Sequence, residues 1–443
     1  MFKTQVDISE IIKKNAQPLQ RIPQDVAPVM PLIANKHFIL LGEATHGTHE
    51  FYAARVEITK RLILQHGLTA IAIEGDWPSA YRVNEYVRCR GTDTNPNEAL
   101  SNFQRFPLWM WRNQVVLDFI IWLREHNENL PPEKRVGFYG LDMYSLFESV
   151  SAVLEYLDQV DPEAARDART QYACLEHFGS GQHYGYGVIL GKRPSCKDEV
   201  IRVLTELHRA SMRYAKEGDL VSEDDQFQAE QNARLVKSAE SYYRQMFDRQ
   251  ANTWNLRDAH MFETLQALHT FLSQRNQCDA KIAVWEHNSH LGDARATYMS
   301  ERTQYNLGQL VRQAYTDDCA LIGFTTYSGT VTAASEWDGP AYRKTVRPAL
   351  PNSVENIFHN SGMQNFFVPM VGDLAEVFSK SYLQRAIGVL YLPQTERASH
   401  YFDCRLANQF DAIFHFDETT ALEPLDSGSE WIRGEEATYP FGV

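Results

Sequence analysis

The chain has no long hydrophobic run, no paired cysteines and no excess of basic charge, and each absence excludes a class of protein. Its six cysteines are scattered over 443 residues without any CxxC pair. This spacing indicates neither a zinc ribbon nor a small disulfide framework, and it fits a reducing cytoplasm. No stretch approaches the roughly 20 apolar residues of a membrane span, and the N-terminal segment lacks a signal-peptide core. We expect a cytoplasmic protein with no membrane partner.

The charge balance and the serine context exclude two further classes. Lys and Arg number 43 against 57 Asp and Glu, which gives a formal net charge of -14. A protein that binds nucleic acid through phosphate contacts needs clustered basic residues, so we expect no nucleic-acid partner. No serine has glycine two residues before and two after it, so the nucleophile elbow of the α/β-hydrolases is missing. The sequence does not indicate an oligomeric state.

Short apolar runs rich in β-branched residues recur along the chain and predict strands. They cover residues 37–42, 69–74, 136–141, 281–285, 319–325, 387–392 and 410–416. Each of the earlier runs is followed by a segment long enough for a helix, which is typical of βαβ crossovers. The predicted fold class is α/β, with a largely parallel central sheet flanked by helices.

A long helical stretch separates the third and fourth predicted strands. Its apolar residues recur at intervals of three and four, as at Val200, Val203 and Leu207, which predicts amphipathic helices. We expect residues 1–144 and 276–443 to form an α/β catalytic domain and residues 145–275 a helical insert or lid subdomain. The glycine-rich segment 179–191 fits neither GxGxxG nor a Walker loop, and we expect a mobile surface loop there.

Titratable side chains gather just after four of the predicted strands. They are Glu43 and His46, Glu74 and Asp76, Asp142, and Glu286, His287 and His290. The carboxyl ends of neighbouring parallel strands share one edge, so these groups should converge on one cleft. Arg55, on the helix after the first strand, should reach that edge only if its helix bends over the cleft.

Histidines beside carboxylates suit two kinds of hydrolysis. A neutral histidine is the usual general base near pH 7, and a neighbouring carboxylate fixes its tautomer. Such a base supplies about 10²–10⁴-fold in rate, so a donor to the developing oxyanion is also needed, either Arg55 or a second histidine. Two histidines three residues apart could instead bind zinc or manganese, although the HExxH signature is absent.

Five ordered motifs resemble the erythromycin esterase family, which has a GxxH-type fold. They are LGEATHGTHEFYAARVEITKRLI, AIAIEGDWPSAYRVNEYV, RFPLWMWRNQVVLDFIIWLR, VGFYGLDMYSL and VWEHNSHLGDARATYM. The resemblance extends from about His37 to Asp417. It implies that a histidine activates water to hydrolyse an ester or a macrolide lactone, without a metal or a cofactor.

The resemblance also assigns roles to residues of this sequence. The implied catalytic residues are His46, Glu43, Glu74, Arg55 and His287. The implied substrate-binding residues are His290, Arg257, Met261 and His400, and the aromatic content around the third motif adds Trp109. The expected partner is a small-molecule ester or lactone. Two alternatives remain open: a metal-dependent hydrolase that uses His46, His287 and His290 as ligands, and a non-catalytic binder of a macrocyclic or haem-like ligand.

Overall fold

The structure is a computed structural model that describes residues 8–21, 23–175, 178, 180–192, 194–217, 223–248, 251–428 and 431. It contains two compact units. Unit 1 comprises Met1–Ile71, Tyr86–Gly137 and Asp279–Val443, and unit 2 comprises Ala72–Glu85 and Phe138–Cys278. The strands β3 (Ala70–Asp76) and β4 (Gly137–Asp142) begin in unit 1 and continue in unit 2. Each unit is described by itself.

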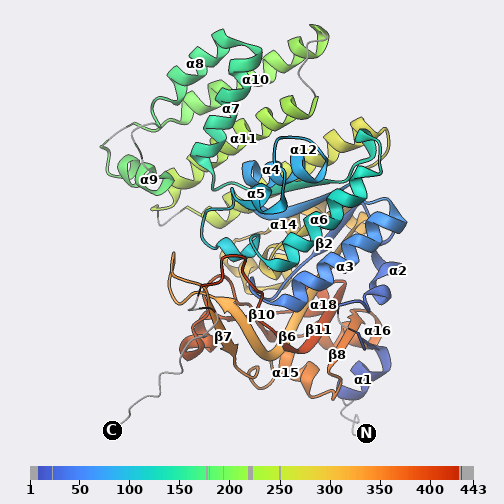
Figure 1. Ribbon diagram of the computed structural model, residues 1–443. Helices are drawn as coiled ribbons and strands as arrows, with labels where there is room; N and C mark the ends of the chain where they lie inside the picture. The colour runs from blue at the N-terminus through green and yellow to red at the C-terminus, as the bar shows by residue number, and fades with distance from the viewer. Residues whose placement is uncertain are drawn as a thin grey trace. The chain divides into compact units, whose positions relative to one another are not determined.

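Unit 1 is built on a largely parallel sheet, which confirms the predicted fold class (Figure 1). Its strands lie in the order β1 (Gln17–Pro18), β8 (Asn365–Pro369), β11 (Ala412–Thr419), β6 (Cys319–Ala333), β2 (Phe38–Leu41) and β5 (Ile282–Trp285). From β11 to β5 the neighbours are parallel, whereas β8 pairs antiparallel with β11. The strand β7 (Tyr342–Val346) pairs antiparallel with residues 329–333 at the carboxyl end of β6. The strands β9 (Tyr382–Arg385) and β10 (Tyr401–Cys404) form a separate antiparallel pair. β2 and β5 end in register, so their carboxyl ends share one edge.

Unit 1 contains long and short helices in addition to this sheet. They are α1 (Ile8–Asn15), α2 (Met30–Ile33), α3 (His49–His66), α5 (Pro96–Leu100), α6 (Gln114–Glu128), α13 (Asn288–Leu291), α14 (Leu307–Tyr315), α15 (Val354–His359), α16 (Gly372–Phe378), α17 (Glu396–Ser399) and α18 (Leu406–Gln409). On one face, Phe51 of α3 packs against Phe324 of β6 and Phe416 of β11. His415 alternates with Phe416 along β11, so it faces the other side, where it packs against Phe358 of α15.

Unit 2 consists mainly of helices. They are α7 (Leu146–Val160), α8 (Pro162–Tyr172), α9 (Gly181–Ile189), α10 (Lys197–Glu217), α11 (Glu223–Gln245) and α12 (Thr253–Asn276), and α4 (Trp77–Val87) lies largely in the same unit. α11 contacts α7, α9, α10 and α12 and so forms the centre of this group (Figure 1). Among the described residues, no helix is both long and apolar enough to cross a membrane.

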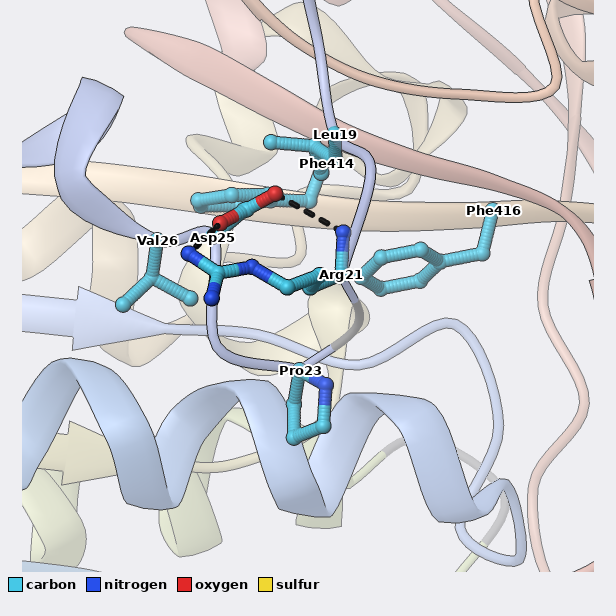
Figure 2. Close-up of a pocket in the computed structure, with 7 residues that line it drawn as sticks. All are labelled: Leu19, Arg21, Pro23, Asp25, Val26, Phe414 and Phe416. Carbon is cyan, nitrogen blue, oxygen red and sulfur yellow. Dashed lines mark hydrogen bonds and ion pairs between the residues drawn. The ribbon is translucent and has the colours of Figure 1, made fainter.

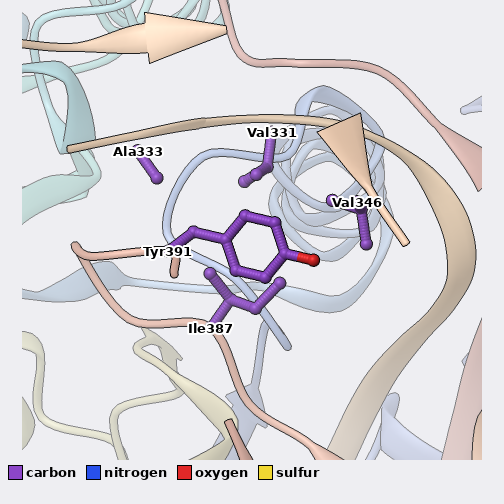
Figure 3. Close-up of a cluster of buried hydrophobic side chains, with 5 residues drawn as sticks. All are labelled: Val331, Ala333, Val346, Ile387 and Tyr391. Atoms are coloured by element: carbon purple, nitrogen blue, oxygen red, sulfur yellow. The ribbon is translucent and has the colours of Figure 1, made fainter. Parts of the chain in front are cut away.

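Six of the seven predicted strands are confirmed, and the strand predicted at 387–392 is wrong. That segment makes only isolated bridges, from Ile387 to Thr45 and from Leu390 to Ala334. Two of its apolar side chains, Ile387 and Tyr391, belong instead to a buried cluster between β6 and β7 (Figure 3). The cluster consists of Val331, Ala333, Val346, Ile387 and Tyr391. Burial of these two side chains, rather than a strand ladder, therefore accounts for the apolar residues at positions 387 and 391.

The glycine-rich segment is also different from the expected loop, because residues 181–189 form the helix α9. A Cβ added to Gly181 would lie 2.3 Å from the ring of Tyr243, and one added to Gly185 would lie 1.9 Å from the Tyr243 carbonyl oxygen. The glycines therefore let α9 approach the end of α11 closely. Residue 179, also in the predicted loop, lies outside the described residues.

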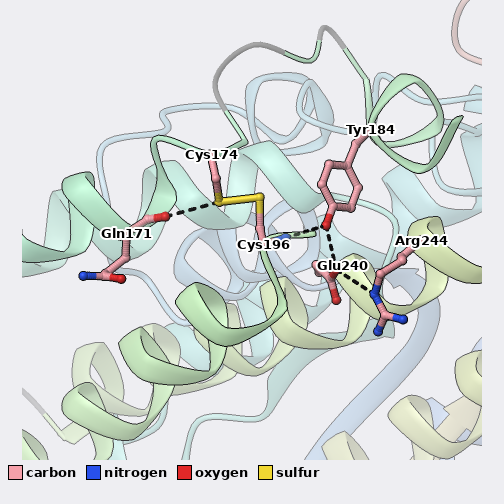
Figure 4. The surroundings of a disulfide bond; sticks show 6 residues. All are labelled: Gln171, Cys174, Tyr184, Cys196, Glu240 and Arg244. Atoms are coloured by element: carbon pink, nitrogen blue, oxygen red, sulfur yellow. Dashed lines mark hydrogen bonds and ion pairs between the residues drawn. A yellow bond between two sulfur atoms is a disulfide. The ribbon is translucent and has the colours of Figure 1, made fainter. Parts of the chain in front are cut away.

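One disulfide, between Cys174 and Cys196, was not indicated by the cysteine spacing. Figure 4 shows it beside Tyr184, whose hydroxyl accepts the Cys196 N–H at 2.9 Å and donates to Glu240 at 2.6 Å. Disulfide pairing depends on the distance between two Cα atoms in space, here 6.0 Å, and a sequence separation of 22 does not reveal that distance.

A shallow hollow on unit 1 is lined by a tight turn and by two sheet residues (Figure 2). The lining residues are Leu19, Arg21, Pro23, Asp25, Val26, Phe414 and Phe416. The Asp25 carboxylate accepts the backbone N–H groups of Arg21 and Gln20 at 2.8 and 2.9 Å, and these bonds lower the pKa of Asp25. None of the residues predicted for the active site lines this hollow.

The loop 42–48 between β2 and α3 is held by backbone hydrogen bonds on two sides. The Thr332 N–H donates to the Gly47 carbonyl at 2.9 Å, and the Ile387 N–H donates to the Ala44 carbonyl at 2.8 Å. The His46 N–H donates in turn to the Ile387 carbonyl at 3.3 Å. The loop that carries His46 is therefore fixed to β6 and to Ile387, whose side chain belongs to the cluster of Figure 3.

We expect Gly47→Ala to destabilise unit 1, because the new Cβ would lie 1.8 Å from the Thr332 carbonyl oxygen. Overpacking of this kind costs about 1–3 kcal/mol in the free energy of unfolding, or more when backbone must move. The matched control is Gly388→Ala, where an added Cβ meets no atom within 4 Å. Denaturant unfolding measures both variants, and equal stability of the two would contradict the close approach.

A second prediction concerns His260 of α12, whose side chain is buried and whose Nδ1 has no hydrogen-bond partner among the described residues. Burial lowers its pKa from 6.5 to about 4. Below pH 6.5 the unfolded chain therefore binds a proton that the folded chain refuses, and stability falls as the pH decreases towards 4. Between pH 7 and pH 5 this residue should remove about 2 kcal/mol from the free energy of unfolding.

The measurement is denaturant unfolding of the parent and His260→Gln at both pH values. The variant should lose about 2 kcal/mol less than the parent on acidification. His183→Gln, at an exposed histidine of the same unit, is the control and should follow the parent. Parallel losses in all three proteins would rule out a buried neutral histidine at position 260.

Candidate active site

Glu43, His46 and Arg55 form a buried hydrogen-bonded chain beyond the carboxyl end of β2. Glu43 Oε1 lies 2.8 Å from His46 Nδ1, and Glu43 Oε2 accepts from Arg55 Nη2 at 2.7 Å. The three side chains are 1%, 8% and 0% exposed, respectively. Arg55 lies in the second turn of α3, and helical side chains point back towards the helix N-terminus. Arg55 therefore reaches Glu43 without the bend of α3 that the sequence analysis required.

The Arg55 guanidinium lies between two aromatic rings. Its central carbon is 4.3 Å from the ring centroid of Tyr52 and 5.3 Å from that of Trp285. Its Nε and Nη1 have no hydrogen-bond partner among the described residues. A buried charge without a counter-charge is strongly unfavourable, so the Glu43 carboxylate is the group that makes a buried Arg55 tolerable.

The contact with Glu43 fixes the tautomer of His46. An ionised carboxylate can only accept a hydrogen bond, so His46 Nδ1 carries the proton that it donates to Glu43. In the neutral ring, Nε2 then holds the lone pair. His46 is thereby arranged to accept a proton at Nε2, as a general base must.

His287 lies beside His46 and comes from the end of the neighbouring strand β5. The two ring centroids are 4.8 Å apart, and the ring planes are inclined by 46°. Both residues are buried, and His287 is 4% exposed over the whole residue. The structure therefore brings together two of the strand-end motifs that the sequence analysis expected to converge.

Asn288 joins these two motifs, although the sequence analysis gave it no role. Its backbone N–H donates to the Glu43 carbonyl at 2.8 Å, and its Nδ2 donates to the Phe324 carbonyl at 2.7 Å. A Cβ on Gly42 would lie 2.1 Å from Asn288 Oδ1. The sequence did contain an indication of this role, because Asn288 is a short polar residue between His287 and His290, just after a buried strand.

His290 is buried on α13, three residues after His287. It is 2% exposed, and its backbone N–H donates to the His287 carbonyl at 2.9 Å. This bond belongs to the first turn of α13 and fixes the backbone rather than the ring. A substrate-binding role for His290 stays a prediction.

Glu74 and Arg257 lie in unit 2, where they form a second charged cluster with Asp142. Arg257 Nη2 donates to Glu74 Oε1 at 2.8 Å and to Asp142 Oδ2 at 2.7 Å, and Arg257 Nε donates to Asp142 Oδ1 at 3.0 Å. The guanidinium carbon is 5.1 Å from the ring centroid of Tyr144. Burial by itself lowers the pKa of Arg257, but Asp142, Tyr144 and Glu74 more than offset this, and the pKa lies well above its usual value. Arg257 therefore remains charged and holds both carboxylates.

The remaining predicted substrate-binding residues lie in packed surroundings. Met261 on α12 is fully buried, and Trp109 packs edge-on against Phe106 with centroids 5.5 Å apart. His400 Nε2 accepts the Leu392 N–H at 3.0 Å, and burial lowers the pKa of His400. These contacts give each residue a structural function, and their roles in substrate binding stay predictions.

The metal-binding alternative required His46, His287 and His290 as ligands. In the part of the chain that the structure describes, no group of three or more His, Cys, Asp or Glu side chains is placed to hold a metal ion. A chelator distinguishes this alternative from hydrolysis without a metal.

We expect Glu43→Gln to destabilise unit 1 strongly, because it leaves the Arg55 charge buried without a counter-charge. Breaking a buried ion pair in this way costs about 3–5 kcal/mol in the free energy of unfolding. The matched control is Asp158→Asn, which breaks an ion pair with Arg169 whose side chains are 44% and 45% exposed. That loss should be much smaller, because an exposed ion pair contributes little to stability. Similar losses in both variants, measured by denaturant unfolding, would contradict the buried pair.

The sequence of this chain matches a known protein family. The model of the family described as erythromycin esterase matches residues 63–419, and it begins after the loop that carries Glu43 and His46. A curated relative, "Erythromycin esterase type II" of Escherichia coli, is 21% identical over 418 residues, which cover 90% of this chain and 93% of that protein. The aligned region of this relative is therefore longer than the family match.

Two solved structures share the fold. A protein described as a succinoglycan biosynthesis protein is 22% identical with a TM-score of 0.75, and the match covers 95% of this chain and 99% of that one. A mutant of the erythromycin esterase EreC in its open conformation is 18% identical with a TM-score of 0.63, and covers 93% and 98%. The family match spans most of the sequence, and the chain therefore belongs to the erythromycin esterase family and is a hydrolase of that family.

Proposed function

We propose that this hydrolase cleaves a carboxylic ester or lactone by attack of a water molecule that His46 activates. The observation that carries the proposal is the 2.8 Å contact between His46 Nδ1 and Glu43 Oε1. It leaves Nε2 of His46 as the proton acceptor, and it stabilises the imidazolium that forms when the proton arrives. The family membership supports the same class of reaction.

The reaction balances with this chain's own side chains. His46 Nε2 takes a proton from water while the water oxygen forms a bond to the ester carbonyl carbon. The bond from that carbon to the alkoxy oxygen then breaks, and the proton held by His46 passes to the departing oxygen. The products are a carboxylic acid and an alcohol, which in a lactone remain joined as one hydroxy acid.

Arg55 acts in this proposal through Glu43. Its Nη2 binds the carboxylate oxygen that His46 does not use, so Glu43 is held from both sides. The aromatic rings of Tyr52 and Trp285 flank the guanidinium and limit its movement. Arg55 is therefore a positioning residue for the base.

The substrate class is tested with a panel of macrolide lactones and smaller carboxylic esters, with mass gain of one water as the readout. His46→Ala should lower kcat by about 10²–10⁴-fold, the usual contribution of a general base. The matched control is His359→Ala, since His359 Nδ1 also contacts a carboxylate, Asp417 Oδ1, at 2.7 Å elsewhere in unit 1. His359→Ala should keep the parent rate.

The same panel decides between the proposal and its alternatives. Turnover should persist in the presence of a chelator, whereas loss restored by a divalent ion would establish the metal-dependent reaction. Calorimetric binding of a panel member that is recovered unchanged would establish a binding protein. Equal rates for the parent and His46→Ala would refute His46 as the base.

A further inference from the structure

Ser289 determines which nitrogen of His287 can carry a proton. The backbone N–H of Ser289 donates to His287 Nδ1 at 3.2 Å, and Ser289 Oγ lies 2.8 Å from the same nitrogen. A backbone N–H can only donate, so Nδ1 must present its lone pair. The neutral imidazole of His287 therefore has its proton on Nε2.

His46 is held in the opposite tautomer. Its Nδ1 donates to Glu43, so its lone pair is on Nε2. Two buried imidazole rings with centroids 4.8 Å apart thus present one acceptor and one donor at their Nε2 atoms. Identical side chains acquire different chemistry because one neighbour is a carboxylate and the other is an N–H group.

We propose that His287 is the electrophilic partner of His46: a neutral imidazole, fixed with its proton on Nε2 by Ser289, which donates a hydrogen bond to the substrate oxygen that gains negative charge. The inference rests on the proposed ester or lactone hydrolysis. It assigns His287 a donor function distinct from that of the base, and it makes Ser289 its positioning residue.

The donor is arranged before the substrate arrives. His287 is the N-cap residue of α13, where its Nδ1 accepts the Ser289 N–H. The Ser289 carbonyl in turn accepts from Asn306 Nδ2 at 2.7 Å, and Asn306 is 1% exposed. Asn288 ties the same turn to the Glu43 carbonyl. A donor fixed in this way needs no reorganisation when charge develops on the substrate, which is the basis of oxyanion stabilisation.

No proton needs to leave His287 in this scheme. When the water oxygen adds to the carbonyl carbon, the carbonyl oxygen takes the electron pair of its double bond, and the Nε2–H of His287 donates to it. The pair returns as the bond to the departing oxygen breaks. The transferred proton moves from water to His46 Nε2 and then to the alcohol, so His287 stays neutral throughout.

Two substitutions of His287 separate its two nitrogens. The amide nitrogen of Gln occupies about the position of His Nε2 and can donate from there, whereas the side chain of Asn ends at about the position of Nδ1. We expect kcat on the ester that the parent hydrolyses to fall about 10²–10³-fold in His287→Asn, the usual effect of losing one oxyanion donor. His287→Gln should keep a kcat well above that of His287→Asn, with KM similar in both.

Stability should rank the two variants in the opposite order. Asn is a preferred N-cap residue and keeps an acceptor for the Ser289 N–H, whereas Gln is too long for this position. Thermal unfolding should therefore find His287→Asn more stable than His287→Gln. If His287 had only a structural function, activity would follow stability and Asn would be the more active variant, which would overturn the proposal.

The tautomers themselves are measured on the parent protein with ¹⁵N-labelled histidine, by long-range correlation of ring nitrogens with ring protons. Assignment uses the spectra of His287→Gln and His46→Asn. We expect a protonated Nε2 in His287 and a protonated Nδ1 in His46 near pH 7.5. A protonated Nδ1 in His287 refutes the inference for any substrate. If the tautomers are as expected but the protein hydrolyses no ester or lactone of the panel, the proposed reaction is refuted, and the donor function of His287 with it.

Discussion

The buried ion pair between Glu43 and Arg55 is the interaction on which the arrangement of the site depends. Both side chains are at most 1% exposed, so neither charge is stabilised by water. Because an unpaired charge there is strongly unfavourable, the pair fixes the loop after β2 against the second turn of α3. The second oxygen of Glu43 is then left to hold His46. A structural ion pair and the orientation of a catalytic base thus share one carboxylate.

Backbone hydrogen bonds and close packing also hold the loop 42–48, which carries Glu43 and His46. The carbonyl of Gly47 accepts from Thr332, and the backbone of His46 bonds to Ile387, whose side chain is anchored in the cluster of Figure 3. Only glycine fits at positions 42 and 47, since a Cβ there would meet Asn288 Oδ1 or the Thr332 carbonyl oxygen. The packing of β6 and of the cluster of Figure 3 therefore determines the position of the loop, and with it the position of the His46 ring at the edge of the sheet.

The sequence predicted the features that follow from local periodicity and missed those that depend on tertiary neighbours. Buried parallel strands read as continuous apolar runs, so β2 and β5 and the polar groups after them could be found. Segment 387–392 is also an apolar run, but it makes only isolated bridges and no strand. Glycines 181 and 185 disfavour a helix locally, and only the contact with Tyr243 explains why α9 contains them. The contact of Arg55 with Glu43 follows from the geometry of α3. It could be predicted from the sequence only if the first residue of this helix were already known.

The two histidines show why residue type is not enough to assign a catalytic role. His46 and His287 have the same side chain, are both buried and both follow a buried strand. They differ in what faces Nδ1: a carboxylate oxygen for His46 and a backbone N–H for His287. The first neighbour favours a ring that gains a proton, because the resulting positive charge is compensated by Glu43. The second disfavours it, because a proton on Nδ1 would face the N–H of Ser289. A base and a neutral donor side by side are what water attack on a carbonyl group requires, one to take the proton and one to stabilise the oxygen.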